Sequence, residues 1–487
     1  MIPPLAGRLF TPAGAATVLV ALVALLHLLV AGRFELSGDE AHYALYAYHL
    51  DWSYFDHPPM VGWLLATLLP ISDSEFVLRL WPVMLSVLSS WLLFQLTQRL
   101  YPDSSPWVAT VAVALLHSAI IYQLLSMAMV PDSPLVPVGL ALALLLHRAV
   151  IEGKTMSWLA IGVMFGLAGL SKYTAVLLVF GTALIVLQGQ WRQLLTPWLW
   201  GGVVIAMVVI SPVLWWNLQH DWISISYQLG HGMPERNWSL QRVGLSLLGQ
   251  FLAYGPLLVV AAVMATLSGI NNSRHRFTLF LAWPLLLFFG WNSGYEPSLP
   301  HWTLIGWALL LPTAAYWLVT RWANLSVRIL AWGGGGYSVV LVLLVHSSLF
   351  TPWLPFEDER YPLADLYGWE QAADRALELA AANGVEGSEP LPLYAGNWSF
   401  ASHIAWYARP AQVKVSDDKY TQNDIWFGSP VVGESAILVV PYQFRNEPQS
   451  NGTQRFKQCE LRESVPVIFR QRTATSYQLY LCREYLG

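Results

Sequence analysis

The stretch "FELSGDEAHYALYAYHLDWSYFDHPP", residues 34–59, combines eight acidic or histidine side chains with seven aromatic rings. It directly follows an apolar run, 13–31, of about 19 residues, which is long enough to cross a bilayer. Ionisable groups at a membrane edge cost free energy and usually mark function. An amphipathic helix over 41–50, lying in the membrane interface, would explain the tyrosines. It would not explain the acidic pair Asp39-Glu40 or the "DHPP" that ends the stretch.

The composition indicates a membrane protein with a soluble tail. Of the 487 residues, 55% are hydrophobic and 11% are charged, whereas a soluble protein carries about 25% charged residues. Residues 1–350 hold 27 of the 56 charged residues and the last 137 residues hold the other 29. We therefore expect a transmembrane domain, 1–350, followed by a water-soluble domain, 351–487. The net charge of −4 argues against nucleic acid as a partner.

Apolar segments recur along the first 350 residues, and each is a candidate membrane span. The first follows Arg8 and has features of a secretory signal, but no clear cleavage site follows it, so we expect a retained anchor. The sequence predicts an all-α domain of about 11 transmembrane helices, near residues 13–31, 76–98, 106–126, 133–151, 157–170, 173–188, 197–216, 241–267, 277–292, 301–319 and 328–350.

Basic residues decide the predicted topology. The segments 157–170 and 173–188 could be two spans or one long helix. Two spans and a cytoplasmic N-terminus keep the basic residues of the loops inside, as the positive-inside rule requires, whereas one span would move five arginines outside. The hairpin reading therefore places the stretch 34–59 and the tail on the outer side.

The sequence pattern of the tail predicts a small α/β domain. The segment 367–384 has the pattern of a helix that ends at Asn383-Gly384, and four apolar segments, 391–396, 412–416, 435–441 and 476–482, read as strands. Cys459 and Cys482 both lie in the tail. They suit one disulfide if the tail is extracytoplasmic, and the sequence leaves their pairing open.

Three further polar residues fall on the predicted outer side. Asp132 lies in "VPDSPLVP", where helix capping is the alternative to a functional role. Lys172 is one of two lysines in the first 350 residues; it either snorkels or supplies a charge for a phosphate. His231 lies between glycines in "YQLGHGMPERNW". Carboxylates, a lysine and a histidine on one membrane face suit catalysis on a charged lipid headgroup, and by themselves indicate an outer-face enzyme or transporter.

Four motifs resemble a known family. "GDEAHYALYAYHLDWSYFDHPPMVGWL", "PDSPL", "GLAGLSKYTAVLL" and "WNLQHDWISISYQLGHG", in this order between Ala13 and Trp302, resemble the GT-C fold glycosyltransferases. The nearest group is the bacterial protein-mannosyltransferase-like superfamily that includes the aminoarabinose lipid A transferases. The resemblance implies a bacterial inner-membrane enzyme that moves a sugar from a polyprenyl phosphate carrier to a glycolipid or other envelope acceptor, with the tail periplasmic.

The resemblance also implies roles for individual residues. Asp39 and Glu40 match the family's acidic pair, in which the aspartate is the catalytic candidate. Donor phosphate binding falls to Lys172, with His57 and Arg79 beside it, although the aminoarabinose transferases have a lysine where this sequence has His57. Asp56, Asp132 and His231 are expected in the cavity or near the acceptor. The resemblance makes no cofactor certain, and a divalent metal on Asp56 and His231 stays open.

The rival function is a transporter or flippase of lipid-linked saccharides. Such proteins place charges near the midplane and show inverted repeats, whereas here the charges gather at one edge and no repeat is evident. A membrane-anchored binding protein with a sensory tail would explain the tail but not the edge carboxylates. The sequence does not name the sugar, the carrier length, the acceptor, the stereochemical outcome or the oligomeric state.

Overall fold

The computed structural model describes residues 11–232, 237–357, 359–384, 389–447, 451–469 and 471–487. The chain folds as two compact units, which we describe separately. The first unit contains residues 1–29, 57–61 and 79–346, and the second contains residues 30–56, 62–78 and 347–487. The expected boundary at residue 350 divides a membrane domain from a water-soluble domain, and it stays a prediction. The compact units divide the chain differently, because the second unit contains residues 30–56 and 62–78 together with the tail.

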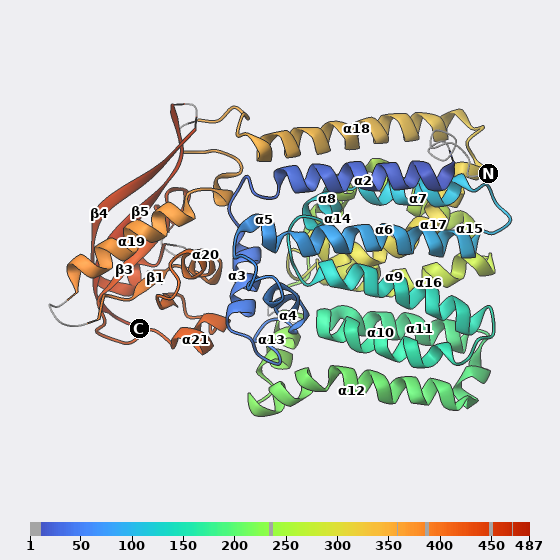
Figure 1. Ribbon diagram of the computed structural model, residues 1–487, viewed down its shortest axis with the longest axis horizontal. Helices are drawn as coiled ribbons and strands as arrows, with labels where there is room; N and C mark the ends of the chain where they lie inside the picture. Colours follow the sequence, from blue (N-terminus) through green and yellow to red (C-terminus); the bar gives the residue numbers. More distant parts are fainter. Residues whose placement is uncertain (1–10, 233–236, 358, 385–388, 448–450, 470) are drawn as a thin grey trace. The chain divides into compact units, whose positions relative to one another are not determined.

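Apolar helices build the first unit, and its long members run alongside one another (Figure 1). Burial separates inner from outer helices, since 83% of the apolar window of Pro300–Thr320 is buried but only 17% of that of Pro197–Gln219. The helices are α2 (Pro12–Val30), α6 (Leu80–Leu100), α7 (Trp107–Ser118), α8 (Ile120–Leu125), α9 (Asp132–Val150), α10 (Ser157–Ser171), α11 (Val176–Leu187), α12 (Pro197–Gln219), α13 (Ile223–Gly232), α14 (Leu240–Tyr254), α15 (Pro256–Gly269), α16 (Ser273–Asn292), α17 (Leu304–Thr320) and α18 (Leu325–Phe350). Short 3-10 helices, η1 (Tyr173–Ala175), η2 (Trp191–Leu195) and η3 (Pro300–Thr303), join some of them.

Length and composition support several membrane spans. Among the described residues, six helices are long and apolar enough to cross a membrane, or up to seven if the bent pair α14–α15 counts as one span. Shorter apolar helices occupy Trp107–Ser118, Ser157–Ser171 and Tyr173–Leu187. Each of the eleven expected segments is mainly helical, so the chain is a polytopic membrane protein. The count of eleven spans stays a prediction.

Breaks between helices interrupt some of the expected spans. Within 241–267 the helix stops at Tyr254 and restarts at Pro256, with a bend of 111°. Gly255 takes a φ of +84°, which glycine adopts readily, and Pro256 suits a helix start because it has no N–H to donate. Within 106–126 the break falls at Ala119, which is extended.

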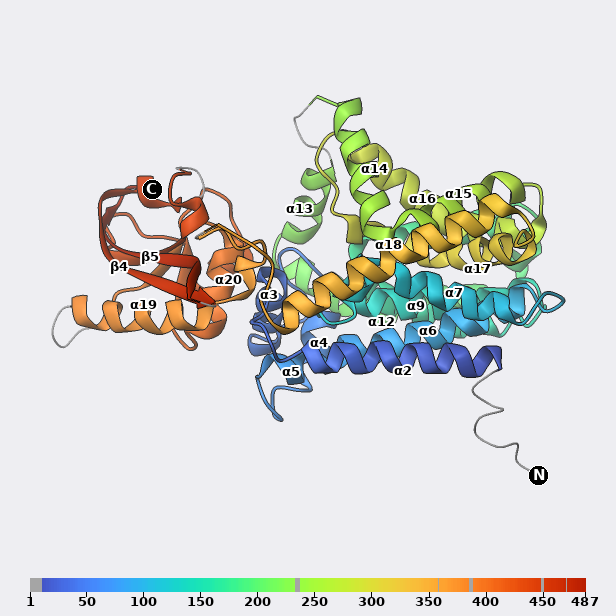
Figure 2. The same cartoon turned by 90° about the horizontal axis from the view of Figure 1, so that it is seen from above.

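The second unit contains a five-stranded sheet in the order β2-β1-β3-β5-β4. The first three strands are parallel, and β5 pairs antiparallel with both β3 and β4. Figure 2 shows α19 running along this sheet. The strands are β1 (Leu393–Ala395), β2 (Val413–Val415), β3 (Ala436–Pro441), β4 (Phe456–Phe469) and β5 (Arg472–Tyr485), and the helices are α19 (Trp369–Asn383), α20 (Trp398–Tyr407) and α21 (Gln422–Phe427), with short 3-10 helices η4 (Ala364–Leu366), η5 (Tyr442–Phe444) and η6 (Thr453–Arg455).

The expected α/β tail is thus confirmed, with one strand missed. β4 is mostly exposed and rich in charge, as is typical of an edge strand, so its alternation is weak. Cys459 and Cys482 lie opposite each other on β4 and β5 and form a disulfide, which settles the pairing that the sequence left open.

Three short helices come from the segments between α2 and α6. They are α3 (Gly38–Tyr48), α4 (Met60–Ala66) and α5 (Glu75–Leu78). Nine of the eleven residues of α3 are buried, and α3 packs against α20 in the second unit. An interfacial helix would expose one apolar face to lipid, whereas most of α3 is covered by protein. The position of residues 41–50 relative to the membrane stays a prediction.

Candidate active site

The acidic pair opens α3. Ser37 is the N-cap and Glu40 completes a capping box, in which Glu40 Oε2 accepts from the Ser37 backbone N–H at 3.1 Å. This is the S-x-x-E pattern of a helix start. Glu40 is buried, whereas Asp39 in the same turn is partly exposed, where the helix dipole favours a negative charge. The two carboxylates therefore differ: Glu40 holds the helix start, and Asp39 is the more accessible.

Asp56 is oriented by two side chains of α3. The Tyr46 hydroxyl donates to Asp56 Oδ1 at 2.6 Å, and His42 Nε2 lies 3.3 Å from the same oxygen. His42 and Tyr46 share a helix face because they are four residues apart. Burial, and then the charge of Asp56, raise the pKa of Tyr46 well above its ordinary value, so Tyr46 remains a hydrogen-bond donor.

A serine from the tail contacts the other nitrogen of His42. Ser402 Oγ of α20 lies 3.0 Å from His42 Nδ1, and the rings of Trp398 and Trp426 pack around the imidazole at 5.2 and 5.8 Å. The sequence reasoning assigned no role to His42, Tyr46 or Ser402. The four-residue spacing of His42 and Tyr46 was a usable signal, but nothing local points to Ser402.

Glu35 joins the same stretch to α19. Its Oε2 accepts from the Trp369 backbone N–H at 2.6 Å. The N-cap position of α19 is Gly368, which has no side chain to cap the helix. The carboxylate of Glu35, which precedes Trp369 by 334 positions, caps the helix instead. Burial raises the pKa of Glu35 to about 7, and the hydrogen bonds from backbone N–H groups oppose that shift.

In the first unit, Asp132 and Lys172 form a buried ion pair. Lys172 Nζ donates to Asp132 Oδ2 at 2.7 Å, and the two side chains are 6% and 2% exposed. Asp132 begins α9 and Lys172 follows α10 in extended conformation. The N-cap of α9 is Pro131, with no side-chain cap, so capping does not explain Asp132. A side chain buried this deeply in an ion pair does not snorkel to water.

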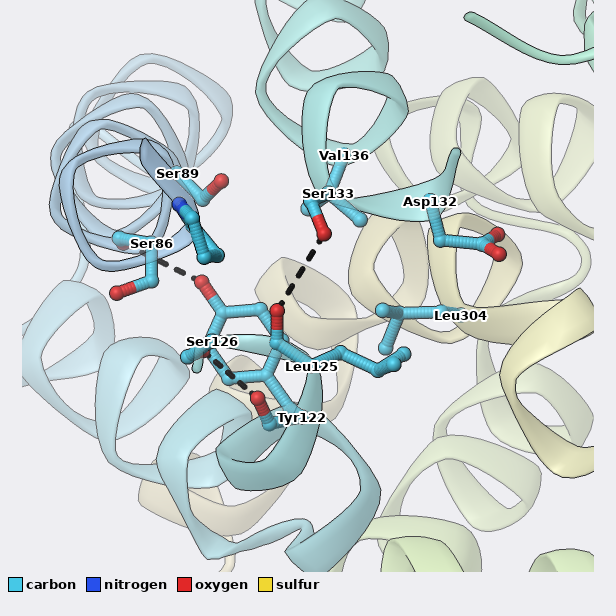
Figure 3. A pocket seen from close by; sticks show the side chains of 10 residues that line it. Ser86, Ser89, Tyr122, Leu125, Ser126, Asp132, Ser133, Val136 and Leu304 are labelled. Atoms are coloured by element: carbon cyan, nitrogen blue, oxygen red, sulfur yellow. Dashed lines mark hydrogen bonds between the residues drawn. The ribbon is translucent and has the colours of Figure 1, made fainter. Parts of the chain in front are cut away.

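A small cavity lies beside this pair, between α6, α8 and α9 (Figure 3). Its volume is about 10 Å³, room for about one water molecule and far too little for a sugar. Tyr122, Ser126 and Ser133 hydrogen-bond to backbone carbonyls there, and the Asp132 carboxylate points away from the serines. The other lining residues include Ser86, Ser89 and Leu304.

The remaining expected residues are less informative. His57 lies partly buried before α4, and Arg79 is a fully buried side chain at the start of α6; both belong to the first unit. His231 is in α13, but its side chain lies outside the described residues. In the part of the chain that the structure describes, no group of three or more His, Cys, Asp or Glu side chains is arranged to hold a metal ion.

Comparisons with known sequences agree with the expected resemblance. The family described as dolichyl-phosphate-mannose-protein mannosyltransferase matches residues 56–216. The lipid A galacturonosyltransferase RgtD of Rhizobium johnstonii is 24% identical over 298 residues, which are 58% of this chain. The match spans 61% of the length of that relative.

Solved structures share the fold over a longer range. ArnT from Cupriavidus metallidurans bound to undecaprenyl phosphate aligns with a TM-score of 0.64 at 15% identity, covering 96% of this chain and 98% of ArnT. The archaeal oligosaccharyltransferase AglB from Archaeoglobus fulgidus aligns with a TM-score of 0.51 at 12% identity, covering 88% and 70%. These likenesses confirm the predicted GT-C fold.

Proposed function

We propose, from the fold that the chain shares with ArnT over nearly its whole length, that it is an integral membrane glycosyltransferase. It moves a sugar from a polyprenyl phosphate carrier to a lipid A-like glycolipid at the outer face of the bacterial inner membrane. The observation that carries this proposal is the near-complete alignment with a protein crystallised with undecaprenyl phosphate. The sequence match to a lipid A galacturonosyltransferase supports the choice of acceptor.

Asp39 is the general base in this proposal. An oxygen of the acceptor attacks the anomeric carbon, the bond from that carbon to the carrier phosphate breaks, and polyprenyl phosphate leaves with the electron pair. A hydroxyl acceptor gives its proton to Asp39, which is partly exposed at the start of α3. A phosphate acceptor is already ionised and needs no base. Glu40 supports Asp39 by completing the cap of the same helix turn.

Lys172 stabilises the leaving phosphate. Its ammonium has three N–H donors, and one is directed at Asp132, so Asp132 fixes the lysine while other donors serve the phosphate. His57 and Arg79, from the same unit, assist there. We assign Asp56 and His231 to acceptor binding. A cation beside the phosphate stabilises the negative charge that develops as the carrier leaves.

The orientation places the C-terminal residues in the periplasm. Disulfides persist in oxidising compartments, and the Cys459–Cys482 disulfide is consistent with that side. The distribution of basic residues puts the N-terminus and the loop near Gly269 in the cytoplasm. Reporter fusions at Gly269 and Gly487 should report opposite sides of the membrane; a result with both on one side would contradict the proposed topology.

Lipid analysis of cells tests the activity. Mass spectrometry of glycolipids from cells with and without the chain should show a sugar adduct on a lipid A-like species that depends on the chain. Loss of the adduct in an Asp39→Asn strain with normal protein levels ties it to this site. An unchanged glycolipid profile, with altered distribution of carrier-linked sugar across the membrane, would instead indicate the transporter.

A further inference from the structure

The hydroxyl of Ser402 has one hydrogen and two polar neighbours. Ser402 Oγ lies 2.7 Å from the carbonyl oxygen of Trp398 and donates to it. The same Oγ is 3.0 Å from His42 Nδ1. Because a hydroxyl donates only once but accepts as well, His42 Nδ1 is the donor in this second contact. Ser402 thereby fixes the proton on Nδ1.

This assignment determines the contact on the other side of the ring. A neutral histidine with its hydrogen on Nδ1 has none on Nε2, and an ionised aspartate has no hydrogen to give. His42 Nε2 nevertheless lies 3.3 Å from Asp56 Oδ1. A hydrogen bond there requires one more proton, carried by the ring or by the carboxyl group. The polar contacts thus run in a line from Ser402 through the His42 ring to Asp56.

The surroundings hold this line in place. His42 is 3% exposed and Ser402 is fully buried. Trp398 and Trp426 pack against the imidazole, and so do Tyr43 and Tyr46 of its own helix, at 5.6 and 5.2 Å. The Tyr46 hydroxyl binds the same Asp56 oxygen as His42. Asp56 itself is 19% exposed at its side chain, so the far end of the line remains accessible.

We propose that His42 is a positioning residue through which Ser402 of α20 orients the Asp56 carboxylate. The inference rests on the proposed glycosyltransferase function and extends it: the C-terminal part of the chain contributes to the orientation of a site acid. In other enzymes a histidine beside a reactive group is itself oriented by a third side chain. Here His42 is the histidine, Asp56 is the reactive group and Ser402 is the third side chain. Its ring links Ser402 to Asp56 and has no contact with substrate in this role.

Two substitutions of His42 separate the two contacts. A glutamine amide can reach the place of Nε2 and donate to Asp56, whereas an asparagine amide reaches only the place of Nδ1. We expect His42→Gln to retain most of the turnover number and His42→Asn to lose on the order of 100-fold, the cost typical of a misplaced group. The loss should appear in kcat more than in KM, and both variants should unfold at similar temperatures. Equal kcat values for the two variants would overturn the inference.

Ser402→Ala provides the second arm and a matched control. It removes the contact to Nδ1 and should lower kcat, whereas Ser399→Ala, on the same helix but facing Gly38, should not. Ser402→Ala should add nothing in the His42→Gln background, because Ser402 acts through the ring. If Ser402→Ala lowers kcat as much in the His42→Gln background as in the parent, the inference is contradicted. This comparison does not use His42→Asn, so it holds even if that variant fails to fold. A parent protein without transferase activity would instead refute the proposed function.

Discussion

Two acids of the proposed site, Asp132 and Asp56, are held in opposite ways. In the first unit, Asp132 meets the Lys172 ammonium directly, and both side chains are buried. In the second unit, Asp56 is held by a tyrosine hydroxyl and a histidine and keeps 19% of its side chain exposed. A buried ion pair depends on both partners, whereas a hydrogen-bonded, accessible carboxylate can meet a substrate. We therefore expect the pair to govern stability and donor binding, and the acids of the second unit to govern turnover.

The largest expected effect is on turnover in the second unit. Asp39→Asn keeps the size of the side chain and removes its charge, so we expect a loss of about 10²- to 10⁴-fold in kcat, the range for a general base. Turnover of carrier-linked sugar measures it, with the unfolding temperature as the check on folding. Asp51→Asn is the control, because Asp51 is exposed and its carboxylate accepts a hydrogen bond from the Trp52 backbone N–H. An Asp39→Asn protein as active as the parent would show that Asp39 is not the general base. A smaller loss would indicate a phosphate acceptor.

The next effect concerns the stability of the first unit. Lys172→Met leaves Asp132 buried without its cation, and breaking such a pair costs about 3–5 kcal/mol. The double variant Asp132→Leu/Lys172→Met should recover most of that stability, because replacing both charges by apolar groups is often neutral. Thermal unfolding in detergent measures both.

The same variants separate stability from donor binding. The double variant should fold but bind the carrier-linked donor weakly, since the phosphate has lost its cation. A double variant that binds the donor as well as the parent does would show that Lys172 does not bind the donor phosphate. If it is no more stable than the single variant, the ion pair does not govern the stability of this unit.

The smallest effect is the pH dependence of the contact between Glu35 and α19. The folded-state pKa of Glu35 is raised from 4.5 to about 7, so folding favours the protonated carboxyl group. Its contribution to stability is complete below pH 4.5 and is lost as the pH rises through 7. That contribution amounts to at most about 3 kcal/mol. In Glu35→Gln this part of the dependence should vanish, whereas Glu378→Gln, at an exposed site of α19, should keep it; identical pH curves for Glu35→Gln and the parent would contradict the assignment.

Local patterns in the sequence predicted local structure well. The apolar segments became helices, and Ser37 with Glu40 formed the capping box that their spacing indicates. The strands of the tail were recognised where they are buried, and the exposed edge strand β4 was missed. The bend at Gly255-Pro256 has a clear local cause, although the run of apolar residues concealed it.

The partners of the site residues could not be predicted in the same way. Lys172 meets Asp132 across 40 positions, and His42 meets Ser402 across 360. Each contact depends on how helices pack, and a single sequence does not record which helix ends meet. The same holds for Glu35, whose role as the cap of α19 depends on the lack of a side chain at Gly368.

The most direct test of the central claim is transfer by the purified full-length chain in liposomes. The donor is polyprenyl phosphate carrying galacturonate, with other carrier-linked sugars in parallel, and the acceptor is lipid A in the same membrane. We predict a glycosylated lipid A and free polyprenyl phosphate in equal amounts, formed by the parent and nearly absent with Asp39→Asn. Movement of the intact donor across the bilayer without any product from any donor, or equal product from both proteins, would contradict the account.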